Sequence, residues 1–365
     1  MTDYENWLAR DTGDRLQALD QCGPFSYTLA LNNLGHFSLA LPAGFPRDLL
    51  DYDRRVLFWR KPPGGQLRLD FVGLIRLMTT DAPGGFIRRV VEGSDGNELL
   101  NRRIVAYAAA SAQASKTAVA ANFMDQIVRE NGGKSSDTAA SRLYGTSYFS
   151  VEDNTGLGPS ITKAYAYRNL LDVLRDLSDA ARTAGTATYF GVVPVTESAF
   201  QFRTQVGQWG KDRTADSGNP LVFSIENENL ANPLLIEDAR DEVTIAYALG
   251  DGEESQRDVQ TSEDTTRSGR SLFGRREAAI NAVGNATAGV LDAADGRVNK
   301  GRPVTRFTAN LLSVPGYTYG VDWDFGDLVT VSFDGRQFDA LIRSVTVSVG
   351  ADKRETISTV VEARL

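Results

Sequence analysis

The chain has 365 residues, of which 42% are apolar and 24% charged, a composition typical of a soluble globular protein with two or three domains. Its net charge of −8 argues against a nucleic-acid binder whose affinity depends on neutralising phosphates, because such binding needs a basic surface. The sequence contains no apolar run long enough to span a membrane, and its acidic N-terminus does not resemble a signal peptide. We therefore expect a protein that folds in the cytoplasm and has no membrane segment.

The amino-acid content restricts metal and catalytic chemistry. Cys22 is the one cysteine, so the chain can form no internal disulfide and no thiolate zinc or iron–sulfur site. His36 is the one histidine, and a catalytic triad or a Cys-His pair would have to use it in a predicted loop. We expect no catalytic residue, no metal site and no cofactor.

The first 95 residues alternate apolar and polar side chains in short runs. This alternation predicts strands at 25–31, 37–41, 55–59, 67–78 and 86–92. The last three are separated by turns rich in proline and glycine, at 62–65 and 82–85. Several short strands at this spacing are typical of a small antiparallel barrel or sandwich. We assign residues 1–95 to a first β-barrel domain.

A helical period replaces this alternation in the middle of the chain. Residues 114–131 and 168–184 each place apolar side chains along one helical stripe and end at a glycine. Strands are predicted at 189–193 and 200–206, and the turn residues of 211–220 predict a linker. Residues 96–218 are therefore predicted to form an α+β inserted domain.

The end of the chain repeats the pattern of its beginning. Strands are predicted at 328–333, 337–349 and 354–362, with Asp334-Gly335 as a hairpin turn. The segment Phe71–Arg76 corresponds to Phe338–Arg343, and Val90–Glu92 corresponds to Val360–Glu362. An internal duplication explains this match, although any two meanders rich in valine and isoleucine look alike.

We assign 219–250 and 303–365 to a second, discontinuous β-barrel, which contains predicted strands at 221–225 and 243–249. Residues 251–302 are predicted to leave it as an insertion, with a mobile polar loop followed by a helix at 275–292. The expected fold class is α+β and mainly β, with two similar antiparallel β-barrel tube domains, an α+β insert and a smaller helical and loop insert.

One stretch, from 243 to 280, has a distinctive layout. A strand ends in the acidic turn Gly250-Asp251-Gly252-Glu253-Glu254, and the predicted helix start Phe273–Glu277 follows. Together with Asn32–Pro42, Leu99–Val105 and Gly210–Thr214, this layout resembles the Gp37-like family of siphophage tail proteins, which is related to baseplate-hub proteins. The signature and interface candidates are Gly250, Gly252, Glu253, Glu254, Arg257, Arg275, Arg276 and Glu277.

The resemblance implies a structural hub protein of a phage tail tip or baseplate, and not an enzyme. It implies a homotrimer whose barrels form a pseudo-sixfold ring, joining a sixfold tail tube or distal tail protein to a threefold tip. Genome DNA would pass through an acidic lumen without specific binding, and fibre, tip and tape-measure proteins are possible partners. The protein would be assembled in the host cytoplasm and located in the virion. The acidic turn would lie at a subunit contact, with Arg257 or Arg275 as ion-pair partners.

Other functions remain open at this stage. Asp251, Glu253 and Glu254 could bind calcium, because clustered oxygens on a loop suit hard cations. A solvated acidic turn is the better explanation, because the run lacks the alternating ligands and the distal glutamate of an EF-hand loop. Paired carboxylates among 47 acidic residues could make the chain a carbohydrate-active tail enzyme. An oligosaccharide- or nucleic-acid-binding module would need clustered exposed aromatics, whereas Trp59, Trp209 and Trp323 are scattered.

Overall fold

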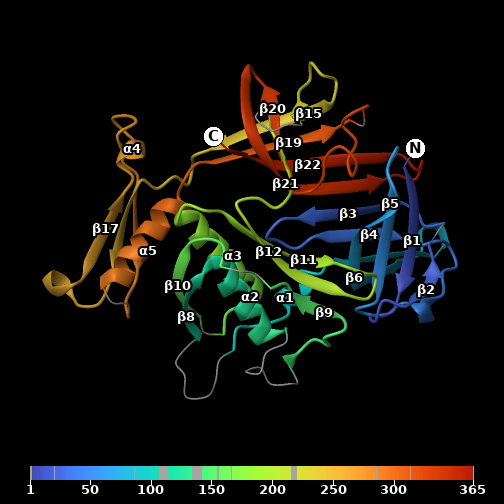
Figure 1. The fold of residues 1–365 in the computed structure, drawn as a ribbon, viewed down its shortest axis with the longest axis horizontal. Helices are drawn as coiled ribbons and strands as arrows, with labels where there is room; N and C mark the ends of the chain where they lie inside the picture. The colour runs from blue at the N-terminus through green and yellow to red at the C-terminus, as the bar shows by residue number, and fades with distance from the viewer. Residues whose placement is uncertain are drawn as a thin grey trace. The chain divides into compact units, whose positions relative to one another are not determined.

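The computed structural model describes residues 2–364, except 20, 86, 107–113, 134–141, 154–155, 166, 215–219, 285–286 and 313. The chain divides into two compact units, one formed by Met1–Leu234 with Thr308–Leu365 and the other by Leu235–Phe307. Strands far outnumber helices, which confirms the prediction of a mainly β protein (Figure 1).

The first unit begins with a group of seven strands. They are β1 (Asp3–Ala9), β2 (Arg15–Ala18), β3 (Phe25–Ala30), β4 (His36–Ala40), β5 (Arg55–Lys61), β6 (Arg68–Asp81) and β7 (Arg88–Ser94). Their order in the sheet is β3-β4-β7-β6-β5-β1-β2. All five predicted strands are confirmed within a few residues. β1 and β2 were not predicted, because polar residues such as Asp3, Glu5 and Asn6 obscure the alternation of β1.

This part of the sheet is strongly curved. β3 and β5 are four positions apart in the strand order, a distance of about 19 Å in a flat sheet. The rings of Tyr27 on β3 and Phe58 on β5 nevertheless lie 5.1 Å apart, and Tyr27 also stacks on Phe71 of β6. All three side chains are buried. The sheet therefore wraps around an aromatic core, although the pairings of the described residues close no barrel.

A second group of strands comes from the end of the chain and its centre. They are β13 (Asp212–Arg213), β14 (Val222–Phe223), β15 (Leu230–Asp238), β19 (Val304–Leu311), β20 (Leu328–Phe333), β21 (Arg336–Val349) and β22 (Glu355–Arg364). β21 pairs with β3, so both groups share one sheet, in which the blue and red ends of the chain lie side by side (Figure 1).

The two groups have the same strand order. The first runs β3-β4-β7-β6-β5 and the second runs β15-β19-β22-β21-β20. Taken in chain order, β3, β4, β5, β6 and β7 therefore correspond to β15, β19, β20, β21 and β22. The one large difference lies between the first two strands of each group. A short turn joins β3 to β4, whereas residues 239–303, which make up most of the second unit, stand between β15 and β19.

Local details of the two groups also correspond. β6 and β21 each have 14 residues, and each carries a β-bulge, between Ile75 and Leu77 in β6 and between Ile342 and Ser344 in β21. The Ile75 amide donates to the Arg54 carbonyl at 2.9 Å, and the Ile342 amide donates to that of Asp327 at 3.0 Å. One predicted match is wrong. The register opposes Ile342 to Val361 and Ile75 to Gly93, so Val361 corresponds to Gly93 and not to Val91.

Helices and short strands lie between the two groups. They are α1 (Glu98–Asn101), β8 (Ala114–Val119), α2 (Ala120–Asn131), β9 (Phe149–Val151), β10 (Ser160–Tyr165), α3 (Leu170–Thr183), β11 (Thr188–Pro194) and β12 (Phe200–Val206). Leu174 and Phe123 of the helices pack in one core with Phe190 and Phe202 of the strands. The prediction of a helix at 114–131 is wrong for its first third, because these six residues form β8, which pairs with β10.

The second unit has one sheet, with β16 (Ile245–Leu249) between β17 (Val259–Glu263) and β18 (Glu277–Asn281). α5 (Thr287–Lys300) covers it, with Val290 and Ala294 packed against Ala246 and Ala248, and the short α4 (Thr265–Ser268) follows β17.

The structure of this unit differs from three predictions. The predicted helix at 275–292 is β18 plus only the start of α5, because pairing with β16 overrides the helical propensity of the Ala-rich β18. The polar segment predicted as a mobile loop contains β17 and α4. β16, which was assigned to the second barrel, pairs with β17 and β18 among the described residues.

Candidate assembly interface

The eight signature residues form two groups at opposite ends of the second unit's sheet. Gly250, Gly252, Glu253, Glu254 and Arg257 lie in the turn that follows β16. Arg275, Arg276 and Glu277 lie at the other end, where Glu277 of β18 is opposite Ile245. Four residue steps of about 3.3 Å separate the ends of β16, a distance of roughly 13 Å. The structure therefore does not bring the signature residues together as one site.

Backbone geometry explains the two glycines of the acidic turn. Gly252 has φ +97°, and a Cβ atom there would lie 2.3 Å from the carbonyl oxygen of Gln256. At Gly250, whose amide donates to Asp258 at 2.7 Å, a Cβ atom would lie 2.9 Å from Val290 of α5. A side chain at either position would disturb the turn, so these glycines shape it.

The carboxylates of this turn face solvent. Asp251, Glu253 and Glu254 are exposed, and Asp251 Oδ1 accepts a hydrogen bond from the Gly284 amide at 2.8 Å. The Arg257 guanidinium donates to the Gly250 carbonyl at 3.4 Å. Within the part of the chain that is described, no group of three or more histidine, cysteine or acidic side chains is arranged to hold a metal ion.

The opposite end of the sheet carries arginines and two large apolar side chains. Arg275 donates to Glu277 at 2.7 Å and to the Tyr247 hydroxyl at 2.9 Å, so its acidic partner within the chain is Glu277 and not the acidic turn. The neighbouring Leu272 is 97% exposed and Phe273 is 88% exposed. We call residues 269–276 the tip loop. Its exposure was missed because Phe273 was interpreted as part of a helix start.

The other motifs of the family resemblance hold parts of the first unit together. The side chain of Asn32 accepts a hydrogen bond from the Phe190 amide at 2.8 Å. Asn97, which lies two residues before the second motif, accepts one from the Val192 amide at 2.8 Å, and both bonds attach β11 to the first strand group. Gly210 lies so close to Asp327 that a Cβ atom would be 2.4 Å from its carboxylate. The Lys211 amide donates to the same carboxylate at 2.6 Å.

A network of buried charges also joins the two strand groups. Arg60 of β5 is 1% exposed, and its guanidinium donates twice to Glu355 of β22, at 2.8 and 2.9 Å. The Tyr4 hydroxyl donates to the same carboxylate. Burial is the largest single influence on the pKa of Glu355 and would raise it, but the hydrogen bonds and charge of Arg60, together with hydrogen bonds from Tyr4 and Thr2, lower the pKa of this carboxyl below its usual value. The sequence did not indicate the role of Arg60, because its position in a strand looks like that of any other charged strand residue.

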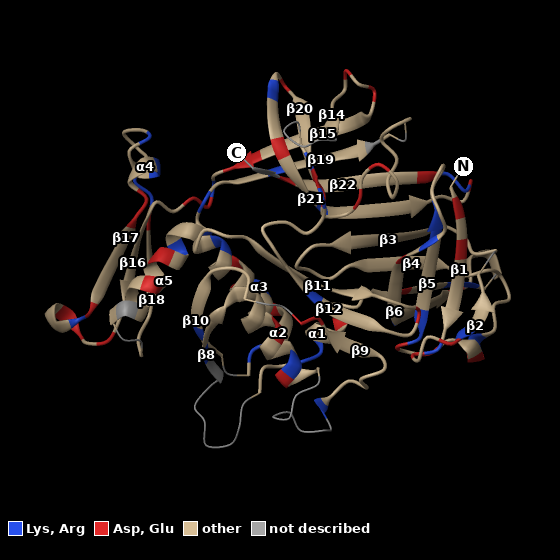
Figure 2. Ribbon diagram, in the orientation of Figure 1, with Lys and Arg blue, Asp and Glu red and all other residues tan. Residues whose placement is uncertain are grey.

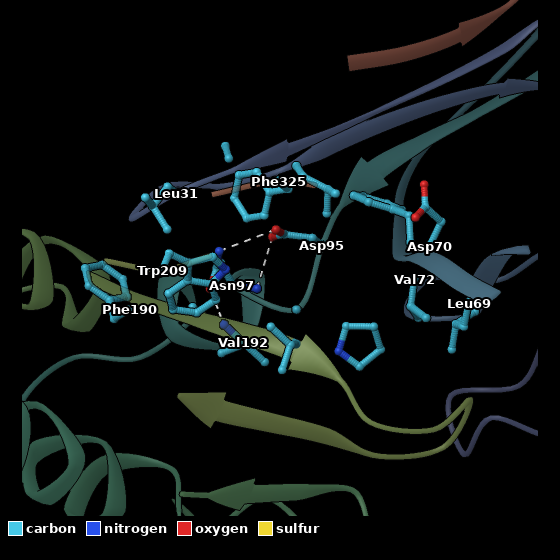
Figure 3. Close-up of a pocket in the computed structure, with 17 residues that line it drawn as sticks. Leu31, Leu69, Asp70, Val72, Asp95, Asn97, Phe190, Val192, Trp209 and Phe325 are labelled. Atoms are coloured by element: carbon cyan, nitrogen blue, oxygen red, sulfur yellow. Dashed lines mark hydrogen bonds between the residues drawn. The ribbon is translucent and has the colours of Figure 1, made fainter. Parts of the chain in front are cut away.

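A small cavity of about 170 Å³ lies between the first strand group and β11 (Figure 3). Apolar side chains line most of it, among them Leu31, Val192 and Phe325, and the carboxylate of Asp95 also borders it. The Asn97 amide donates to Asp95 at 3.1 Å. Burial raises the pKa of Asp95 to about 7, despite the backbone hydrogen bonds to its carboxylate.

Asp95 should make the stability of the protein depend on pH. The folded pKa lies above the unfolded value of about 3.9, so the folded protein keeps a proton that the unfolded chain releases. This stabilisation is fully present below about pH 4 and is lost as the pH rises towards 7, by an amount on the order of a few kcal/mol.

We expect Asp95→Asn to flatten the profile of unfolding free energy between pH 4 and 7, measured by denaturant titration. Asp334→Asn, in an exposed hairpin turn, is the matched control. An unchanged profile in Asp95→Asn would contradict this role.

The fold is shared with solved phage tail proteins. The 43 kDa tail protein of prophage MuSo2 from Shewanella oneidensis matches with a TM-score of 0.62 and 13% identity, covering 99% of this chain and 98% of that one. A tail protein from Neisseria meningitidis has a TM-score of 0.58 and 11% identity, covering 98% and 96%. Prophage tail protein gp18 from Listeria monocytogenes has a TM-score of 0.54 and 12% identity, covering 99% and 94%. The fold is therefore that of a phage tail protein.

The family follows from the sequence itself. The family model described as Siphovirus ReqiPepy6 Gp37-like protein matches residues 11–361, and the chain belongs to this family. This confirms the resemblance seen in the sequence. A search of curated proteins finds no match. Among the described residues, no helix has the length and apolar content needed to cross a membrane.

Proposed function

We propose that this protein is the hub of a phage tail tip or baseplate, in which three chains form a ring that mates a sixfold tail tube with a threefold tip. The observation that supports this most is the strand order that occurs twice in the chain. Two similar modules in each of three chains give six modules around a closed ring. Such a ring offers similar surfaces to a sixfold partner while keeping threefold symmetry.

Two unpaired strand edges provide the means of joining the chains. Within the chain, β3 pairs with residues 344–349 of β21, beyond the bulge. The corresponding part of β6 is Leu77–Asp81, which pairs with β7 on one side and has no partner among the described residues on the other. The strand that corresponds to β3 is β15, which lies at the edge of the sheet. We propose that β15 of one chain pairs with the edge of β6 in the next.

Exposed apolar residues on both edges support this pairing. Leu77 on β6 and Leu234 on β15 are each 53% exposed, and Ile236 is also exposed. An exposed edge strand with apolar side chains is an aggregation hazard unless another strand covers it. Pairing between chains would cover both edges at once, and it would repeat around the ring the contact that β3 and β21 make within the chain.

The position of the ring suggests its partners and its lumen. A distal tail protein or tail-tube ring would bind on one side, tip and fibre proteins on the other, and a tape-measure protein could occupy the bore. The net charge of −8 suits a channel through which genome DNA slides without specific binding, since like charges repel. The protein would then be part of the virion tail tip, assembled in the host cytoplasm.

The mass of the assembled protein tests this proposal. Light scattering of the full chain, followed over increasing concentration, should show a species of three times 39.7 kDa, or 119 kDa. A species with a number of chains that is not a multiple of three would contradict the proposal. A chain that stays monomeric both alone and with isolated tail tubes would also contradict it.

A further inference from the structure

The tip loop is the most exposed apolar feature of the second unit. Leu272 and Phe273 are adjacent and almost fully exposed, and contiguous exposed apolar side chains mark interaction sites. The tip loop contains three exposed arginines, at 270, 275 and 276, and no acidic residue, and Arg275 also pairs with Glu277, which directly follows the loop. The loop therefore combines exposed apolar side chains with positive charge, which selects a partner surface that is acidic and partly apolar.

Such a surface exists at the other end of the same sheet. The acidic turn exposes Asp251, Glu253 and Glu254. Figure 2 shows red, acidic segments of chain near the start of β17. Two apolar side chains are also exposed there, Val259 at the start of β17 and Val283. Val283 is close to the turn because the amide of its neighbour Gly284 donates to Asp251. We call these five residues the acidic end. It matches the tip loop in both charge and apolar content.

We propose that the tip loop of one chain binds the acidic end of the neighbouring chain. This inference rests on the proposed ring, because a head-to-tail contact between unlike surfaces closes only under rotational symmetry. It also assigns a role to the two separated groups of signature residues, as the two halves of one contact between chains.

Charge argues against the other way of burying the tip loops. If three tip loops met on the threefold axis, Arg270, Arg275 and Arg276 of each chain would be brought together, and Glu277 is the one acidic residue that directly follows each loop. Like charges that outnumber their counter-charges in this way are unfavourable. Binding to the acidic end of a second copy buries the same apolar side chains and pairs the arginines with carboxylates.

A disulfide cross-link in the full chain tests the contact. Phe273→Cys and Val283→Cys are combined in one chain, where the five-residue β18 lies between the two positions and spans about 13 Å. A disulfide requires Cβ atoms about 4 Å apart, so it cannot form within one chain without rearrangement. The native Cys22 is buried. Under mild oxidation we expect covalent dimers and trimers on a non-reducing gel, whereas each single-cysteine variant gives at most dimers.

Charge reversal provides a second measurement. Glu253→Lys with Glu254→Lys should lower the cross-linking yield about tenfold, because it places lysines against arginines. Glu226→Lys with Glu228→Lys, in an exposed turn of the first unit, is the matched control and should leave the yield unchanged. A particle of ring mass that gives no covalent trimer would overturn this inference and leave the proposed function standing. A protein that forms no ring would overturn both.

Discussion

The Thr80→Pro variant is expected to remain folded but to lose the ring. In β21, the Arg343 carbonyl accepts the Leu31 amide, so the backbone groups of every second residue, including Val345 and Val347, face β3. Met78 and Thr80 are the corresponding residues of β6, and their amides therefore point away from β7 towards the free edge of β6. A proline at position 80 removes one outward donor and places its ring where the next strand would pair. It leaves the ladder with β7 intact. Light scattering at a concentration where the natural protein is trimeric should show monomers.

Two further variants separate strand pairing from general damage. Thr80→Val keeps the amide and the branched shape of the side chain, so it should assemble like the natural protein. Leu234→Lys changes the other edge of the proposed pair, and a lysine there should also block assembly, because charged edge strands resist pairing. Trimers of a folded Thr80→Pro protein, or normal assembly of Leu234→Lys, would contradict the proposed contact.

The Arg60→Met variant is expected to destabilise the first unit by about 3–5 kcal/mol. The substitution leaves the Glu355 carboxylate buried without its cationic partner, and removing one member of a buried pair costs this much. Because Arg60 lies on β5 and Glu355 on β22, the loss would weaken the connection between the two strand groups. Denaturant unfolding at neutral pH measures the effect.

The pH dependence of this variant distinguishes lost charge pairing from lost packing. Without Arg60, burial should raise the pKa of Glu355 above its unfolded value, so the destabilisation should shrink as the pH falls and the carboxyl takes up a proton. A pure packing defect would not change with pH. Arg88→Met is the matched control, since Arg88 pairs with Asp81 on the surface, and it should have little effect on stability. Equal losses in both variants would exclude the buried network as a major contributor.

The sequence predicted the strands that alternate regularly. β4 and the second half of β21 bury every second side chain, and β3 does so over its first three residues, so local periodicity was enough to find these strands. β20, whose first four residues are all buried, was found as a short apolar run before the turn at Asp334-Gly335. β15 was missed, because Asn232 has φ +51° and Pro233 follows it, which interrupts the strand pattern. β18 was mistaken for a helix, because its alanines favour a helix locally while the partner strand decides the outcome.

The candidate interface was predictable only in part. The acidic turn was found because Gly250 and Gly252 mark a turn in any fold. The pairing of Arg275 with Glu277 depends on the direction of β18, which was not predicted as a strand. The unpaired edge of β6 could not be predicted from the sequence either. A strand is an edge strand when no other strand pairs with one of its sides, and this depends on the strand order of the folded sheet.

Averaged electron micrographs of the assembled protein test the central claim most directly. The proposed hub predicts a ring with threefold symmetry in which six similar lobes surround an open bore, because each chain supplies two modules with the same strand order. A ring with three lobes, a closed centre, or any symmetry that does not contain a threefold axis would contradict it.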